Sequence, residues 1–120
     1  MATVILVVDD DPLVRNVVMN MLGAAGYKTL GACSGKEALE ISSNYSGEID
    51  LVITDITMPE MDGLELAHKM RQGRPLIKIL TMSGRDSSKV KAGSHSLPFL
   101  QKPFRYQPLI DKVRIVLQNE

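Results

Sequence analysis

Apolar residues gather in short runs along the chain, and segments of mixed character separate these runs. Five runs are continuous rather than alternating, which is typical of strands covered on both faces of a parallel sheet. They span residues 3–8, 28–32, 50–54, 77–82 and 97–101. The pattern therefore predicts five strands inside a sheet that helices cover on both sides.

The intervening segments carry helix start signals and apolar stripes at helical spacing. Asp11-Pro12 is a favourable pair for an N-cap and a first helical position. Ser34 and Glu37 form a capping box, and Asp62 precedes another helical stripe. The positions expected to face the core are Val14, Val17, Val18, Met21, Leu22, Ala25, Ala38, Ile41, Tyr45, Leu64, Ala67, Met70, Leu109, Ile110, Val113, Val116 and Leu117.

Alternation of strands and helices predicts an α/β fold with right-handed crossovers. We expect a doubly wound, flavodoxin-like parallel sheet of five strands in the order 2-1-3-4-5, which is one choice among the doubly wound orders. The stretch 84–96 holds one branched apolar residue, Val90, together with several serines and two glycines. A shortened or irregular fourth helix is therefore expected there.

Composition and charge fit one domain and disfavour several function classes. The length of 120 residues is close to the commonest domain size, so residues 1–120 are expected to form a single domain. Fourteen basic residues balance fourteen acidic ones, which argues against direct nucleic-acid binding. The chain opens without a basic n-region and lacks an apolar run of about 18 residues, which argues against membrane insertion. The single cysteine, Cys33, fits a cytoplasmic location.

Four of the predicted strands run directly into residues that can carry chemistry. These residues are Asp9, Asp10 and Asp11 after the first strand, Asp55 after the third, Ser83 after the fourth and Lys102 after the fifth. Parallel strands share one carboxyl edge, where open α/β sheets bind ligands. If the first and third strands are neighbours, Asp9, Asp10 and Asp55 converge.

Three carboxylates at one edge need compensation. Two carboxylates about 4 Å apart repel by about 4 kcal/mol at an effective dielectric constant near 20. Either a raised pKa or a divalent cation relieves this repulsion. An oxygen-only set suits Mg²⁺ or Mn²⁺ better than zinc, and Mg²⁺ with few protein ligands usually binds phosphate oxygens as well. With Lys102 as a positive charge and Ser83 as a hydroxyl donor, the edge indicates phosphoryl chemistry.

Structural explanations compete for each residue taken alone. Asp11 is better explained as a helix N-cap, and for Asp9 the cap and the functional interpretation are equally supported. Asp55 is followed by Ile-Thr-Met-Pro and is not an immediate cap. A lone Lys or Ser at a strand end is usually a surface or turn residue. The joint placement of these residues at one edge favours a functional site.

The motifs ILVVDDDP, LVITDITMPEMDG, ILTMSG and FLQKPF together resemble the receiver domain of two-component response regulators, over the whole chain and in order. The resemblance implies that Asp55 is the phosphoacceptor, taking a phosphoryl group from a phosphohistidine of a histidine kinase or a phosphotransfer protein. It also implies that Asp10, Asp55 and the backbone carbonyl of Thr57 ligate Mg²⁺, or Mn²⁺, and that Asp9 does so directly or through water.

The same resemblance assigns the remaining site residues. Lys102 contacts the phosphoryl group, Ser83 moves to hydrogen-bond it, and Phe99 corresponds to the aromatic switch position. The motifs MSG and PFLQKPF resemble receivers fused to the C-terminus of hybrid histidine kinases more than those that control DNA-binding domains. We therefore expect such a receiver or a stand-alone one, as a monomer or weak dimer, and not a turnover enzyme.

Two other classes stay open at this point. A haloacid-dehalogenase-type phosphatase also uses a strand-end Asp, a Ser or Thr, a Lys and Mg²⁺, but it generally has a second acid where this chain has Thr57. A pseudo-receiver would bind partners without taking phosphate. The complete set of acids, Ser83 and Lys102 argues against the pseudo-receiver.

Overall fold

The structure, a computed structural model, describes residues 2–84, 97–102 and 104–118. Its strands are β1 (Val4–Val8), β2 (Lys28–Ala32), β3 (Leu51–Asp55), β4 (Lys78–Ser83) and β5 (Phe99–Gln101). Its helices are α1 (Pro12–Ala24), α2 (Gly35–Asn44), α3 (Gly63–Gly73) and α5 (Tyr106–Gln118).

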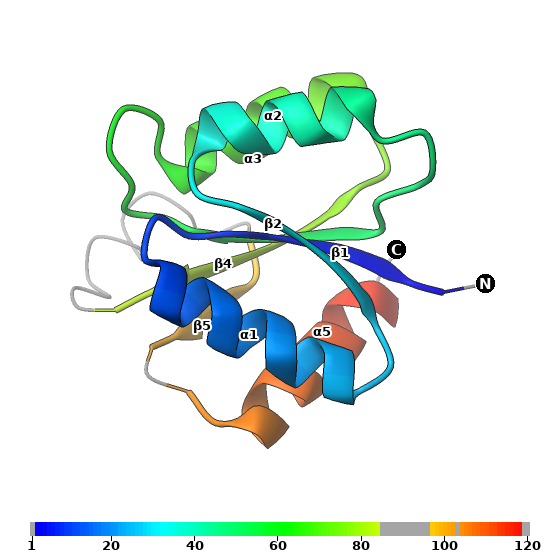
Figure 1. Cartoon of the computed structure of the whole chain (residues 1–120), viewed down its shortest axis with the longest axis vertical. Helices are drawn as coiled ribbons and strands as arrows, with labels where there is room; N and C mark the ends of the chain where they lie inside the picture. Colours follow the sequence, from blue (N-terminus) through cyan, green and yellow to red (C-terminus); the bar gives the residue numbers. More distant parts are fainter. Residues whose placement is uncertain (1, 85–96, 103, 119–120) are drawn as a thin grey trace.

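The five strands form one parallel sheet in the order β2-β1-β3-β4-β5. Helices α2 and α3 cover one face, and α1 and α5 cover the other (Figure 1). The predicted fold class and strand order are confirmed. The expected irregular fourth helix falls on 84–96, and of this stretch 85–96 lies outside the described residues.

The predicted helix caps are present. Asp11 and Asp62 cap α1 and α3 through hydrogen bonds of 2.9 Å and 2.8 Å from backbone N–H groups. The Ser34 hydroxyl accepts from the N–H of Glu37 at 3.1 Å, and the Glu37 carboxylate accepts from the N–H of Cys33 at 2.7 Å. The Glu37 side chain thus reaches one residue further back than a standard capping box requires.

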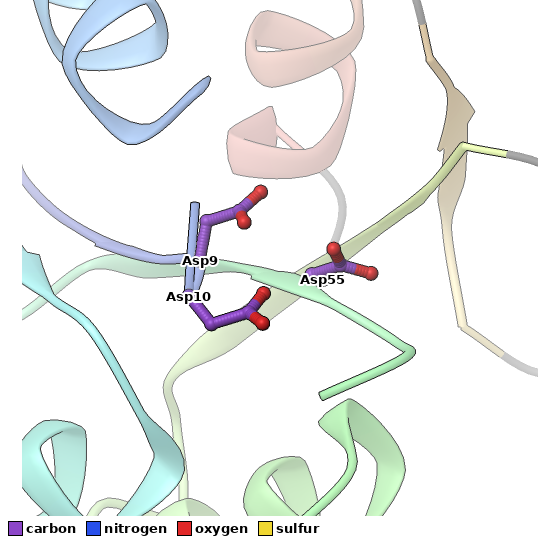
Figure 2. A group of neighbouring side chains, drawn as sticks. All are labelled: Asp9, Asp10 and Asp55. Carbon is purple, nitrogen blue, oxygen red and sulfur yellow. The ribbon is translucent and has the colours of Figure 1, made fainter. Parts of the chain in front are cut away.

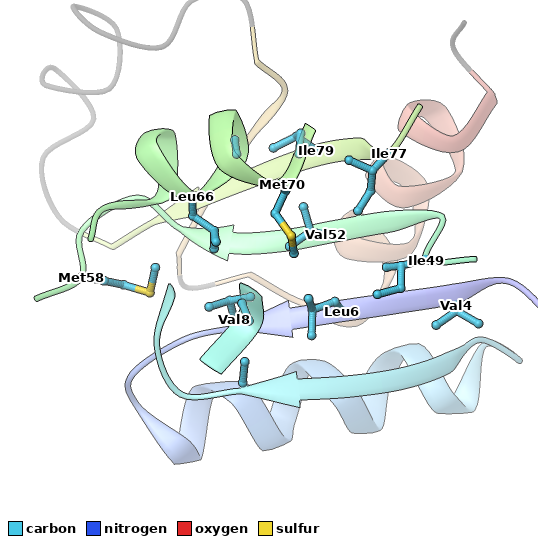
Figure 3. Packing of buried hydrophobic residues seen from close by; sticks show 13 residues of the cluster. Val4, Leu6, Val8, Ile49, Val52, Met58, Leu66, Met70, Ile77 and Ile79 are labelled. Atoms are coloured by element: carbon cyan, nitrogen blue, oxygen red, sulfur yellow. The ribbon is translucent and has the colours of Figure 1, made fainter. Parts of the chain in front are cut away.

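Each face of the sheet carries its own hydrophobic cluster. In β1, Leu6 points into the cluster under α2 and α3, which Figure 3 shows, while Ile5 points into the cluster under α1 and α5. All five residues of β1 are buried. Alternate side chains therefore enter two different cores, which explains why the strands appear in the sequence as continuous apolar runs.

Two predictions about the core were wrong in detail. Val17 was expected to face inward, but it is 43% exposed and lies four residues after the more exposed Leu13, on the outer side of α1. In α3 the fully buried residue is Leu66 rather than Leu64, which is only partly buried. Since α3 begins at Gly63, its inward stripe contains Leu66 and Met70 at helical spacing.

Candidate functional site

Three carboxylates meet where β1 and β3 end. These strands are direct neighbours, with Val8 opposite Thr54, so Asp9 and Asp55 leave the sheet side by side. The ligand oxygens of Asp9, Asp10 and Asp55 lie within 4.8 Å of one another. Figure 2 shows the three carboxylates pointing to the same side of the sheet edge. Asp9 and Asp55 are buried, whereas Asp10 is exposed.

Lys102 reaches this cluster from the end of β5. Its Nζ donates to Oδ2 of Asp9 and to Oδ2 of Asp55, both at 2.8 Å. The Oδ1 atoms of the same carboxylates accept backbone N–H bonds from Asp11 and Thr57, both at 2.9 Å. Each of the two buried carboxylates therefore has partners on both oxygens.

The protonation of Lys102 follows from these contacts. Burial alone would lower the pKa of its ammonium group, but the hydrogen bonds and negative charges of Asp55 and Asp9 outweigh burial, so the pKa is raised above its ordinary value. Lys102 is therefore a permanent cation at neutral pH, facing two carboxylates. An arrangement of this kind can neutralise a third anionic group placed between them.

The other predicted residues lie around this centre. Ser83 is the last residue of β4 and is buried, one position beyond Met82, which pairs with Asp55 in the sheet. Its backbone carbonyl accepts the N–H of Lys102 at 2.7 Å. Thr57 is exposed and follows Asp55 by two residues, and Phe99 is half-buried in β5.

Gly63 lets α3 approach the backbone of the site, a role that the sequence analysis missed. A Cβ atom at Gly63 would lie 2.5 Å from the backbone oxygen of Asp55 and 2.9 Å from the Cα of Ile56. The N–H of Gly63 donates to the carbonyl of Ile56 at 2.9 Å. The first residue of α3 thus holds the end of β3 in place, and only glycine fits there without displacing backbone atoms.

Arg15 was also missed. Its Nη1 donates to the backbone carbonyl of Asp9 at 2.9 Å. The available signal was its position, since a cation in the first turn of a helix opposes the helix dipole and needs a compensating partner. The partner that the structure shows is the backbone carbonyl of Asp9, in the acidic run just before α1.

Comparison with known proteins identifies the class of domain. The response regulator receiver domain family matches residues 5–114, and the chain belongs to this family. Receiver domains are phosphoacceptor signalling domains of two-component systems rather than turnover enzymes, so the phosphatase alternative is not favoured. The family is generally Mg²⁺-dependent, in keeping with the cluster of three acids.

Individual relatives agree with this assignment. The chain is 39% identical over 125 residues to the sensor kinase CckA of Brucella abortus (strain 2308), covering 99% of this chain and 13% of that protein. It is 35% identical over 120 residues to the response regulator MprA of Mycolicibacterium vanbaalenii, covering 96% of this chain and 50% of that protein. The chain thus spans half or less of the length of these relatives.

Among solved structures, the receiver domain of the hybrid histidine kinase CckA superimposes with a TM-score of 0.81 at 34% identity, covering 96% of this chain and 99% of that one. Within the described ranges, the helices of this chain include none long and apolar enough to cross a bilayer.

Proposed function

We propose that residues 1–120 form one receiver domain in which Asp55 accepts a phosphoryl group from a phosphohistidine on a histidine kinase or phosphotransfer protein. The observation that carries the proposal is the position of Asp55: its carboxylate ends a buried strand, lies beside Asp9 and Asp10, and touches the Lys102 ammonium at 2.8 Å. In the transfer, an oxygen of Asp55 bonds to phosphorus while the phosphorus–nitrogen bond breaks and the imidazole leaves.

A carboxylate is a weak nucleophile, so the site acts by positioning and by charge neutralisation. The Thr57 N–H holds Oδ1 of Asp55, which fixes the plane of the carboxylate. Lys102, held also by Asp9, stays beside the incoming phosphoryl oxygens and offsets their negative charge. The Ser83 hydroxyl at the end of β4 then donates to the phosphate.

The acid cluster suits a divalent cation. Three carboxylates and one ammonium leave two negative charges at the edge, and the donors are all hard oxygens, as Mg²⁺ or Mn²⁺ prefers. We assign Asp9, Asp10, Asp55 and the Thr57 carbonyl as the residues that hold this ion. When bound, the ion supplies positive charge that helps to neutralise the phosphoryl oxygens.

The same comparisons support a proposal for the setting in which this domain acts. The likeness to a hybrid-kinase receiver, together with the motifs around Ser83 and Lys102, supports a receiver that acts within or beside a histidine kinase rather than one that binds nucleic acid directly. The balanced charge of the chain supports the same interpretation. Such a domain works in the cytoplasm, as a monomer or weak dimer.

Labelling with acetyl phosphate and Mg²⁺, followed by intact-protein mass spectrometry, tests the assignment of Asp55. The wild type should gain one phosphoryl group and Asp55→Asn none, because the amide lacks the nucleophilic oxygen. Asp62→Asn is the matched control, since Asn still caps α3, and it should label like the wild type. Equal labelling of Asp55→Asn would refute the assignment, and an unlabelled wild type that a histidine kinase also fails to label would indicate a pseudo-receiver.

A further inference from the structure

We infer that Arg15 is a positioning residue for Asp10, the exposed carboxylate of the acid cluster. The inference rests on the proposed function, because it concerns the cation that this cluster would hold. In this inference, Arg15 on α1 fixes the orientation of the Asp9–Asp10 peptide group, which precedes the Asp10 side chain.

The contact that carries the inference is the hydrogen bond from Nη1 of Arg15 to the backbone carbonyl of Asp9, at 2.9 Å. The other polar groups of Asp9 are already engaged: its N–H donates to the carbonyl of Ala32 at 3.1 Å, and both carboxylate oxygens have partners. The remaining polar group of Asp9 is its carbonyl, and Arg15 is the hydrogen-bond donor to it. The Asp9 carbonyl belongs to the peptide group that joins Asp9 to Asp10. The direction of this carbonyl therefore fixes the plane of that peptide and the direction in which the backbone enters Asp10.

Asp10 depends on that peptide because, among the described residues, no other group orients its side chain. In the part of the chain that the structure describes, the Asp10 carboxylate makes no hydrogen bond or ion pair, and the residue is exposed. Asp9 and Asp55, by contrast, are buried and held on both oxygens. Within the described ranges, Asp10 is therefore the one of the three acids whose placement depends on its backbone and not on side-chain partners.

The packing around Arg15 holds its side chain over the sheet. Its Cδ lies 3.5 Å from where a Cβ of Gly31 would stand, and Met19 approaches the same point at 2.8 Å. Glycine is unfavourable inside a strand, yet here it leaves room for two side chains of α1 to pack against β2. Arg15 is half-buried in this position, and its guanidinium reaches the Asp9 carbonyl just beyond the end of β1.

Removal of Arg15 should change the Mg²⁺ affinity in opposite directions, depending on whether Arg15 acts through its charge or by positioning Asp10. A cation near three carboxylates disfavours the binding of a second cation, so loss of its charge alone would tighten Mg²⁺ binding. Loss of positioning would weaken it, since groups that orient a ligand typically contribute about 10- to 100-fold to metal affinity. The direction of the change therefore separates the two roles.

The test compares the full chain with the variants Arg15→Met, Arg15→Gln and Arg15→Lys in Mg²⁺ titrations followed by backbone amide resonances. We expect Mg²⁺ to bind about tenfold more weakly to Arg15→Met and Arg15→Gln, with Arg15→Lys in between. Without Mg²⁺, the amide resonance of Asp10 should shift in Arg15→Met while that of Leu66, in the core, does not. Arg71→Met, an exposed change of equal charge on α3, should bind Mg²⁺ like the wild type.

Mg²⁺ affinity of Arg15→Met and Arg15→Gln equal to or tighter than that of the wild type would overturn the inference, and so would equal weakening by Arg71→Met. If Arg15→Met does not fold, Arg15→Gln decides by the same criterion. A wild type that binds no Mg²⁺ would instead overturn the proposed metal site itself, and this inference with it. The two failures are therefore distinguishable.

Discussion

Lys102 holds two carboxylates with one ammonium group, and this contact joins strands from opposite parts of the sheet. Asp9 follows β1, Asp55 ends β3, and Lys102 follows β5 at the sheet's edge. All three are largely buried, so the charges act on one another with little screening by water. Removal of the ammonium would leave mutually repelling acids, so we expect Lys102 to stabilise the fold in addition to its proposed contact with the phosphoryl group.

The raised pKa of Lys102 predicts how this stabilisation depends on pH without Mg²⁺. The contribution should be fully present below the ordinary value of 10.5 and should be lost as the pH rises through the higher pKa of the folded state. The difference in the free energy of unfolding between the wild type and Lys102→Met should thus shrink above about pH 10.5. Urea denaturation followed by circular dichroism at a series of pH values measures it.

Lys69→Met is the control for that series. Lys69 pairs with Glu65 at 3.5 Å on the surface of α3, where both side chains are well exposed, and such pairs contribute little. The difference in the free energy of unfolding between Lys69→Met and the wild type should stay small at every pH. If the difference in the free energy of unfolding between the wild type and Lys102→Met stays constant or grows above pH 10.5, the interaction assigned between Lys102 and the two carboxylates would be contradicted.

At the scale of elements, the ends of α2 and α3 are joined by one side chain. Arg74, the C-cap of α3, donates to the hydroxyl and the carbonyl of Ser42 and to the carbonyls of Tyr45 and Gly47, at 2.8–3.0 Å. These carbonyls lie at and just beyond the C-terminus of α2, where backbone acceptors have no helical partner. The two helices that cover one face of the sheet are therefore fixed to each other.

Arg74→Lys should lower the free energy of unfolding by about 2–3 kcal/mol, because an ammonium group cannot reproduce the forked set of donors. Urea denaturation at neutral pH measures this loss. Arg71→Lys, at an exposed position in the last turn of α3, should change stability by less than about 0.5 kcal/mol. A similar small loss for Arg74→Lys would mean that water satisfies the α2 carbonyls as well as Arg74 does.

Elements were more predictable than the contacts between them. Strands such as β1 and β3 follow from apolar runs, since burial on both faces leaves a local signature, and Asp11 and Ser34 act within their own segments. The fifth predicted strand began at Leu97 and included Pro98, but β5 begins at Phe99. Proline cannot donate to the ladder, so Pro98 contributes only its carbonyl, to Thr81.

The site was predictable to the extent that topology places it. The ends of β1 and β3 bring Asp9 and Asp55 together once the strand order is known. Lys102 reaches Asp9 across two intervening strands, and Arg15 reaches back to the Asp9 carbonyl. Both contacts depend on the conformations of long side chains, which no local sequence pattern predicts. The contact of Gly63 with the Asp55 backbone arises only when α3 packs against the sheet.

At the scale of the whole molecule, the strand order sets the route by which the site can influence distant surfaces. Asp55 ends β3, the central strand of the sheet, and β4 separates β3 from β5, which carries Phe99. Ser83 lies on that route: it ends β4, and its carbonyl accepts the N–H of Lys102 at 2.7 Å. Phe99 pairs with Thr81, two residues before Ser83 on β4. We therefore predict that a shift of Ser83 toward a phosphate on Asp55 is transmitted along β4 to Phe99.

Ser83→Ala should therefore separate phosphorylation from its response. We expect Asp55 still to be labelled by acetyl phosphate, while the movement of Phe99 that we predict for the phosphorylated wild type is reduced. If the hydroxyl contributes about 1–3 kcal/mol to the coupling, the ratio of the two conformations changes about 5- to 150-fold. Fluorine NMR of protein containing fluorophenylalanine measures this, since the chain has only two phenylalanines and Phe99→Leu identifies the relevant line.

Ser43→Ala, an exposed change on α2, is the matched control and should leave the fluorine response of the wild type intact. The comparison also separates two routes through the molecule. If phosphorylated Ser83→Ala moves Phe99 as far as the wild type does, the signal does not pass through the Ser83 hydroxyl. The route would then run through Lys102, which connects Asp55 to the end of β5 without involving that hydroxyl.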